Sequence, residues 1–180
     1  LGDVYKRQEL CRLADQIEIF IFRLVNSFSV GNAIKNGIPV AIIGETNAGK
    51  STLLNLLVNE ERAIVSDIHG TTRDVIEDTI NIQGVTFRFI DTAGIRETED
   101  IVEKIGVGRA KQMAEDADLI LYVVDSSRPL DENDEEIIEM LKDRKAIVLY
   151  NKTDLASAVS MEALKEKINH PLIPISAKEE

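Results

Sequence analysis

The amino-acid sequence predicts an α/β protein with a doubly wound, mostly parallel six-stranded sheet, helices on both faces and one antiparallel edge strand. Short apolar runs alternate with segments whose apolar residues recur at helical spacing, which is typical of strand–helix–strand units. A tight turn at Gly84 joins the runs 76–82 and 85–90, so this hairpin supplies the antiparallel edge. The length of 180 residues suits one domain with a proper core.

The expected elements follow in order, each from its own pattern. Residues 9–35 repeat apolar side chains at helical spacing, from Leu10 to Val25, and predict an N-terminal helix. Strand 76–82 places Ile80 and Ile82 on one face, but Asp78 interrupts that apolar row and leaves the start of the strand open. Other short apolar runs predict buried strands at 39–43, 119–124, 146–150 and 172–175. Amphipathic segments predict helices at 51–58, 104–115, 132–141 and 161–168.

The composition excludes several classes of protein. No apolar run is long enough to span a bilayer and no secretory signal is recognisable, so we expect no membrane association. Cys11 is the single cysteine, so no internal disulfide can form, which fits a reducing cytoplasm. The net charge of −11 repels phosphate backbones, so we expect this fragment not to bind nucleic acid on its own.

A phosphate-binding loop is predicted between the first buried strand and the following helix. Residues 44–51 read GETNAGKS and match G-x-x-x-x-G-K-[ST], with a strand before and a helix after. Backbone N–H groups in such a loop converge on phosphate oxygens, and the helix N-terminus adds positive potential. Lys50 is expected to reach the β- and γ-phosphates and Ser51 to place its hydroxyl on Mg²⁺. The predicted nucleotide contacts here are Asn47, Ala48, Gly49, Lys50, Ser51 and Thr52.

A second motif, D-x-x-G, closes the strand 85–90. Asp91 can hold the water shell of Mg²⁺, and the N–H of Gly94 can meet the γ-phosphate. The motif is short and common by itself. Its position at a strand end, after the loop lysine, makes it evidence for a nucleotide site.

The motif that selects the base follows the strand 146–150. A carboxylate at Asp154 can accept hydrogen bonds from the N1–H and N2–H₂ groups of guanine, whereas adenine would leave it unpaired. Asn151 can bond the base's N7 and brace the loop, and the stem of Lys152 can lie on the base. After the last strand come Ser176, Ala177 and Lys178, where the Ala177 N–H can donate to guanine O6. Four motifs in order, each at a strand end, predict a guanine-nucleotide site.

The order GxxxxGKS, DxxG, NKxD, SAK resembles that of the translation-factor-like P-loop GTPases. The segments GTTRD at 70–74 and DTAGIRE at 91–97 narrow this to the MnmE (TrmE) family of tRNA-modification GTPases. That resemblance implies a G-domain homodimer that hydrolyses GTP to GDP and phosphate under stimulation by K⁺. It also implies that the full-length protein works with tRNA and a flavin-dependent tRNA-modification partner protein.

The resemblance further implies ligands for two metal ions. Asn47 matches the loop asparagine that binds K⁺, and the carbonyls of Ser66 and Ile68 match the switch residues that complete its coordination. Thr72 matches best the switch I threonine on Mg²⁺, beside Ser51 and Asp91. Thr71 is the near alternative and is otherwise grouped with the K⁺ site.

The resemblance assigns catalysis to Lys50, Thr72 and Glu103, the last matching a glutamate that orients the attacking water through a second water. Many small GTPases carry a glutamine after D-x-x-G for this purpose, but Ile95 stands there and cannot hydrogen-bond. From the residues alone, a solvated glutamate at a helix start is the favoured interpretation of Glu103, and Asn47 fits equally a residue that braces its loop. Thr46 departs from the proline that the family often has.

The resemblance covers about residues 9–180 and divides the chain. Residues 1–8 resemble a translated sequencing adapter and are expected to be an assembly scar. Residues 9–36 are expected to be the remnant of a connecting helical domain, and 37–180 a G domain truncated at its C-terminus. The same motifs also fit a nucleotide-dependent switch with negligible turnover, or an assembly module of another translation-factor-class GTPase such as a ribosome-assembly factor.

Overall fold

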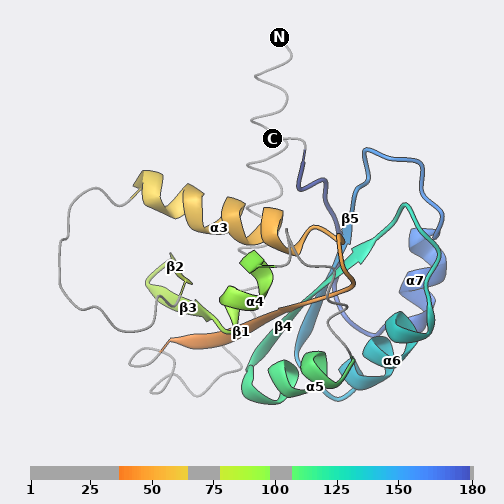
Figure 1. Cartoon of the computed structure of the whole chain (residues 1–180), viewed down its shortest axis with the longest axis horizontal. Helices are drawn as coiled ribbons and strands as arrows, with labels where there is room; N and C mark the ends of the chain where they lie inside the picture. Colours follow the sequence, from red (N-terminus) through yellow and green to blue (C-terminus); the bar gives the residue numbers. More distant parts are fainter. Residues whose placement is uncertain (1–36, 65–77, 98–106, 179–180) are drawn as a thin grey trace, which may run out of the picture.

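The computed structural model describes residues 37–64, 78–97 and 107–178 (Figure 1). The expected N-terminal helix and the segment 1–8 lie outside these residues. The strands are β1 (Ile38–Ile43), β2 (Asp78–Ile82), β3 (Val85–Phe89), β4 (Leu119–Asp125), β5 (Ala146–Asn151) and β6 (Leu172–Pro174). The helices are α3 (Lys50–Ile64), α4 (Thr92–Glu97), α5 (Val107–Asp116), α6 (Glu132–Leu141) and α7 (Met161–Lys167).

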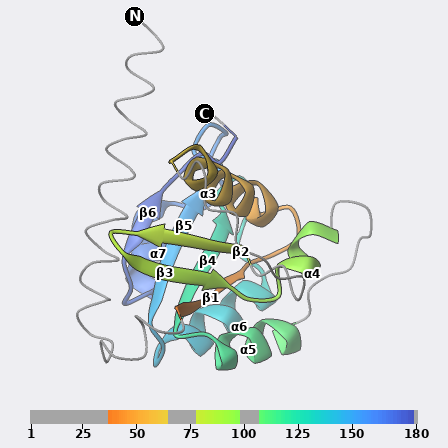
Figure 2. The same ribbon diagram turned by 90° about the vertical axis from the view of Figure 1, so that its left-hand side faces the viewer.

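The strands form the six-stranded, mostly parallel sheet that the sequence predicts. Their order is β2-β3-β1-β4-β5-β6. Strand β2 pairs with β3 in antiparallel register, with Ile80 opposite Phe87, and the other neighbours are parallel. Figure 2 shows this hairpin at one edge, with α3 on one side of the sheet and α5 and α6 on the other. The fold is therefore doubly wound, as expected from alternating strands and helices.

Two apolar layers hold the helices to the sheet because alternate strand residues point to opposite faces. On one face, Leu54 and Val58 of α3 and Ile95 of α4 join a cluster that includes Val40 and Val123. On the other face, α5, α6 and α7 contribute the apolar residues Ala110, Met113, Ala114, Ile137, Ile138, Leu141 and Leu164. Both layers leave the carboxyl ends of β1, β4 and β5 at one edge, where ligands bind in sheets of this class.

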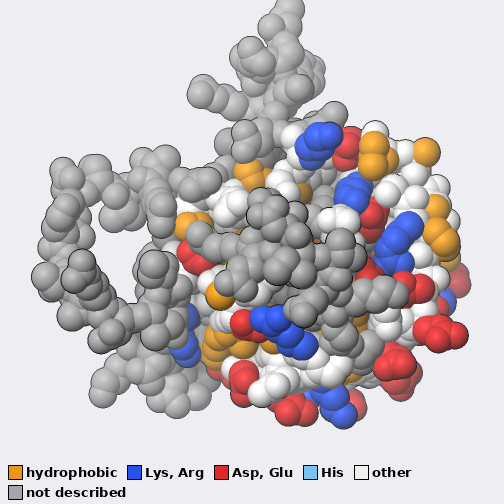
Figure 3. All heavy atoms as spheres, viewed as in Figure 1, with side chains coloured by type: hydrophobic (Ala, Val, Ile, Leu, Met, Phe, Trp, Pro, Cys, Tyr) orange, Lys and Arg blue, Asp and Glu red, His pale blue; other side chains and the backbone are white. Residues whose placement is uncertain are grey.

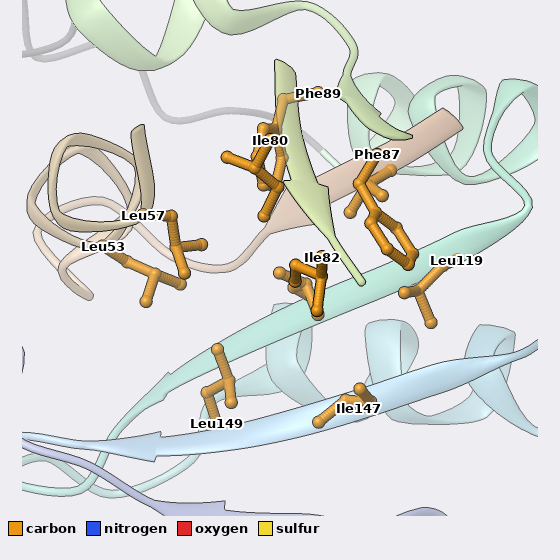
Figure 4. Close-up of a pocket in the computed structure, with 11 residues that line it drawn as sticks. Leu53, Leu57, Ile80, Ile82, Phe87, Phe89, Leu119, Ile147 and Leu149 are labelled. Carbon is orange, nitrogen blue, oxygen red and sulfur yellow. The ribbon is translucent and has the colours of Figure 1, made fainter. Parts of the chain in front are cut away.

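A small apolar cavity of about 40 Å³ lies under α3, toward the β2–β3 hairpin. Figure 4 shows Leu53 and Leu57 of α3 facing Ile80 and Ile82 across it. No polar surface lines this cavity. It is therefore a gap in the packing of the core and has no group that could recognise a nucleotide.

Two elements differ from the sequence prediction. Helix α3 continues to Ile64, six residues beyond the predicted end at 58, through a run of mostly good helix formers that carries no apolar period. Helix α4 was not predicted at all, because DTAGIRE carries a single large apolar side chain, Ile95, and no helical repeat. The predicted start of strand 76–82 is not tested, because residues 76 and 77 lie outside the described residues. Within the described residues the strand begins at Asp78, whose side chain is buried rather than solvated.

Candidate nucleotide-binding site

The loop between β1 and α3 is tight and closely backed by the rest of the protein. Gly49 has φ of +103°, and a Cβ there would lie 2.2 Å from Asn151 Nδ2. Only glycine fits that conformation and that approach. The first helical hydrogen bond of α3 runs from Leu53 N to Gly49 O, so the N–H groups of the first turn of the helix lack helical acceptors. Such a turn provides donors and positive potential for an anion.

Lys50 is buried against this loop, with a 5% exposed side chain. Its Nζ donates to Gly44 O at 2.9 Å and to Glu45 O at 2.6 Å. Burial lowers the pKa of the Lys50 ammonium to about 8, and the negative charge of Glu45 offsets part of that shift. The loop thus holds a desolvated cation against backbone carbonyls. Phosphate oxygens can replace these carbonyls as hydrogen-bond acceptors of Lys50.

The other predicted loop contacts differ in exposure. Ala48 is fully buried and its N–H donates to Glu45 O at 3.2 Å, so this amide is engaged within the loop. Asn47 is exposed, with φ of +61°. Ser51 is half-buried and Thr52 is exposed. The side chains of Asn47, Ser51 and Thr52 are therefore all within reach of a ligand from solvent.

Asn151 joins the phosphate loop to the predicted base-binding segment. Its side chain is 2% exposed; Nδ2 donates to Ala48 O at 2.7 Å, and Oδ1 accepts from Ala177 N at 3.0 Å. One amide side chain at the end of β5 is therefore hydrogen-bonded to the loops that follow β1 and β6. The Ala177 N–H, expected for guanine O6, is engaged with Asn151 in this arrangement.

The rest of the base motif surrounds Asn151. Asp154 is exposed, and its Oδ1 accepts from Ser176 Oγ at 2.8 Å, which orients the carboxylate from the neighbouring loop. Lys152 has φ of +64°, and its Nζ contacts Asp125 Oδ2 at 2.5 Å. Lys178 is exposed. The predicted phosphate and base motifs therefore meet at one edge of the sheet.

Asp125 is a site residue that the sequence interpretation missed. Burial raises the pKa of its carboxyl, but hydrogen bonds from Lys152 and Ser127 outweigh this, so its pKa lies below the usual value. The residue pairs with Asn151 across β4 and β5. Its signal in the sequence was an acidic residue ending an apolar run, beside the next strand that carries a motif.

Asp91 of the D-x-x-G motif is held by an arginine that the sequence did not single out. Arg109 of α5 donates from Nε to Asp91 Oδ2 at 3.0 Å and from Nη2 to both carboxylate oxygens, at 3.0 and 2.8 Å. Gly94 and Ile95 follow in α4, and Ile95 is only 1% exposed in the core. A buried isoleucine there cannot orient a water molecule.

Several predicted residues lie outside the part of the chain that the structure describes: Ser66, Ile68, Thr71, Thr72 and Glu103. Their proposed roles in metal binding and catalysis stay predictions.

The described donors suit a magnesium ion bound mainly through its nucleotide. Mg²⁺ prefers oxygen ligands and commonly takes one or two from the protein, with phosphates and waters supplying the others. Ser51 offers a hydroxyl in the first turn of α3, and Asp91 a partly exposed carboxylate at the end of β3. Within the described ranges no three His, Cys, Asp or Glu side chains cluster as a metal cage. This donor set therefore fits Mg²⁺ accompanying a phosphate group.

The described surface is mixed in charge. Figure 3 shows acidic and basic side chains interspersed on one face, with acidic ones gathered around α5 and α6. The outer face of α6 alone exposes Glu132, Glu135, Glu136 and Glu139. None of the helices among the described residues has the length and apolarity to cross a membrane.

Comparisons with known proteins agree with this geometry. The sequence model of the 50S ribosome-binding GTPase family matches residues 39–152. The tRNA modification GTPase MnmE of Bacteroides thetaiotaomicron is 58% identical over 96% of this chain and 39% of its own length. That of Phocaeicola vulgatus is 62% identical over 88% of this chain and 32% of its own length. The chain thus spans about two fifths or less of these relatives.

A solved structure supports the fold alone. Translation elongation factor SelB of Methanococcus maripaludis, crystallised with the GTP analogue GppNHp, superposes with a TM-score of 0.50 and 22% identity. The match covers 78% of this chain and 30% of that one.

The doubly wound sheet, the phosphate loop and the base motif at its edge define a P-loop GTPase domain. The identities above place it more narrowly: the chain belongs to the MnmE family of tRNA modification GTPases.

Proposed function

We propose that this chain binds GTP together with Mg²⁺ and hydrolyses it to GDP and phosphate. The observation that carries the proposal is the double hydrogen bond of Asn151, to Ala48 O at 2.7 Å and from Ala177 N at 3.0 Å. It fixes the spacing between a phosphate loop and a loop that carries a guanine-selective carboxylate. A site built this way suits a guanine nucleotide lying across the sheet edge.

Each described motif then has a chemical task. Lys50 exchanges its carbonyl partners for β- and γ-phosphate oxygens and stabilises charge that develops on them. Ser51 and Asp91 would supply oxygens for Mg²⁺ and its water shell, and the ion would supply positive charge next to the phosphates. Asp154 accepts hydrogen bonds from the guanine edge, and Lys152 lies along the base.

We propose further that K⁺ and pairing of two G domains stimulate hydrolysis. Support comes from the exposed Asn47 in the loop and from Ile95, whose burial removes the usual water-orienting position. Ser66, Ile68 and either Thr71 or Thr72 are proposed to complete the K⁺ and Mg²⁺ sites. Glu103 is proposed to orient the attacking water. K⁺ bound at Asn47 would supply positive charge near the transferring phosphoryl group.

In the full-length protein we propose that this cycle drives modification of the wobble uridine of tRNA in the cytoplasm, with a flavin-dependent partner protein. The support is the identity to relatives named tRNA modification GTPase MnmE, of which this chain spans 39% and 32%. The acidic net charge of −11 leaves contact with tRNA to other parts of that protein.

The test is the rate of GTP hydrolysis against protein concentration, in KCl and in NaCl. The proposal predicts a rate per molecule that rises with protein concentration and is higher in KCl. Glu103→Ala should keep nucleotide affinity and slow hydrolysis. A rate that is independent of both salt and concentration would contradict dimer-dependent stimulation. Wild-type turnover in the Glu103 variant would remove that residue from the mechanism.

A second candidate is a nucleotide-dependent switch for ribosome assembly with negligible turnover, favoured by the description of the matching family, 50S ribosome-binding GTPase. Single-turnover hydrolysis separates the two. Tight GTP binding with no cleavage in either salt would support the switch and contradict the enzyme.

A further inference from the structure

The carboxylate of Asp91 is fully engaged by one guanidinium. Arg109 Nε and Nη2 donate to Asp91 Oδ2 at 3.0 and 2.8 Å, and Nη2 also donates to Oδ1 at 3.0 Å. Both oxygens that would face Mg²⁺ and its waters are thus directed at a cation of the protein itself. The two residues lie 18 positions apart, Asp91 between β3 and α4 and Arg109 on α5, so their pairing depends on how α5 packs.

The same guanidinium also occupies the space beside Gly94. A Cβ built on Gly94 would meet Arg109 Nη2 at 2.0 Å and Cζ at 2.7 Å. Gly94 is the residue whose N–H is expected to meet the γ-phosphate. One side chain therefore lies against both functional residues of the D-x-x-G motif.

We propose that Arg109 is a latch on the D-x-x-G motif: its guanidinium holds Asp91 and covers Gly94 until Mg²⁺ and the γ-phosphate displace it. Two cations cannot share one carboxylate without mutual repulsion, so Mg²⁺ and Arg109 compete for Asp91. Arg109 acts through Asp91 and is a positioning residue. The inference rests on the proposed binding of Mg²⁺ and nucleotide.

The exposure of the pair suits a contact that opens readily. The side chains of Arg109 and Asp91 are 42% and 37% exposed, so water can replace each partner as the pair separates. Exposed ion pairs hold their closed form by a small factor, and forked geometry places this pair toward the upper end of that range. The latch should therefore raise the Mg²⁺ concentration required about two- to six-fold, because molecules with the latch closed lower the apparent affinity for Mg²⁺ by that factor.

The experiment titrates MgCl₂ against the dissociation rate of a fluorescent, non-hydrolysable GTP analogue from the 180-residue chain, at constant ionic strength. Arg109→Ala should reach half-maximal slowing at about two- to six-fold lower Mg²⁺ than wild type. Arg109→Lys, which keeps the charge but not the fork, should fall between them. Raising NaCl to about 1 M should shrink the difference, because exposed pairs are screened.

Lys111→Ala is the matched control, since it removes the same charge from an exposed position two residues along α5. It should keep the wild-type Mg²⁺ requirement. An Arg109→Ala requirement equal to that of the control, or higher than wild type, would overturn the latch alone, because the wild-type chain would still bind nucleotide with Mg²⁺. Failure of the wild type to bind the analogue would overturn the proposed function and the latch together.

Discussion

Replacement of Asn151 by alanine tests whether one side chain holds the two halves of the site together. The substitution removes the donor to Ala48 O and the acceptor of Ala177 N. Both backbone groups belong to buried residues, Ala48 at 0% and Ala177 at 7% exposure. A buried polar group left without its partner costs about 1–3 kcal/mol. Two such groups give an expected loss of about 2–6 kcal/mol in the free energy of unfolding.

The assay is urea unfolding without nucleotide, followed by titration with GDP. Asn55→Ala is the matched control, because Asn55 is exposed on α3 and alanine is the better helix former. That control should lie within about 0.7 kcal/mol of wild type, on the stabilising side. Asn151→Asp should also destabilise, because it keeps the acceptor for Ala177 but turns a carboxylate oxygen toward Ala48 O.

The loss of unfolding free energy expected for Asn151→Ala exceeds the change expected for the control Asn55→Ala, so urea unfolding can distinguish the two variants. GDP affinity of Asn151→Ala should fall by at least about tenfold, since the phosphate loop loses its tie to the base loop. If Asn151→Ala loses less than about 1 kcal/mol of unfolding free energy, with an unchanged dependence on urea concentration, the Asn151 side chain does not hold the two loops together. Such a result would mean that the packing of β5 alone positions both loops.

Three further outcomes follow from individual contacts. Phosphate should raise the pKa of Lys50 from about 8, so binding takes up a proton and GDP affinity falls as the pH rises through 8; equal binding enthalpies at pH 8 in buffers of different ionisation enthalpy would contradict this. Gly49→Ala should destabilise more than Gly84→Ala in urea, because both have positive φ but only Gly49 has a neighbour within 4 Å; equal losses would argue against a close approach. Tyr122→Phe removes a buried 2.7 Å hydrogen bond to the Asp134 carboxylate and should lower the free energy of unfolding in urea by about 1.5–3 kcal/mol without changing GDP affinity; weaker GDP binding would show that this bond affects the site.

Much of the fold was predictable because each strand and most helices carry their own apolar period. Helix 132–141 was predicted with the bounds that the structure gives. The mostly parallel sheet and its one antiparallel edge strand follow from the alternation of strands and helices and from one hairpin, whereas the strand order was not predicted. Helix α4 was not predictable, because its one large apolar anchor, Ile95, is held by a contact with the core rather than by a local repeat.

The candidate site was likewise predictable only in part. Each motif is local in the sequence, and the rule that the carboxyl ends of parallel strands share one edge predicts that the motifs lie together. The partners of those motifs were hidden. Arg109 and Asp91 are both exposed, and the Asn133 side chain reaches Glu45 across 88 residues of sequence. Such contacts depend on how whole helices and strands pack, so the spacing of residues along the chain does not predict them.

The guanine site is tested most directly by measuring which nucleotide base the protein prefers. The affinities of wild type and Asp154→Asn for GTP, XTP and ATP should be measured side by side in Mg²⁺. We expect wild type to prefer GTP and the variant to prefer XTP, because an amide can donate to the xanthine oxygen where guanine carries its amino group. An unchanged preference for GTP in Asp154→Asn would contradict the assignment of the guanine site.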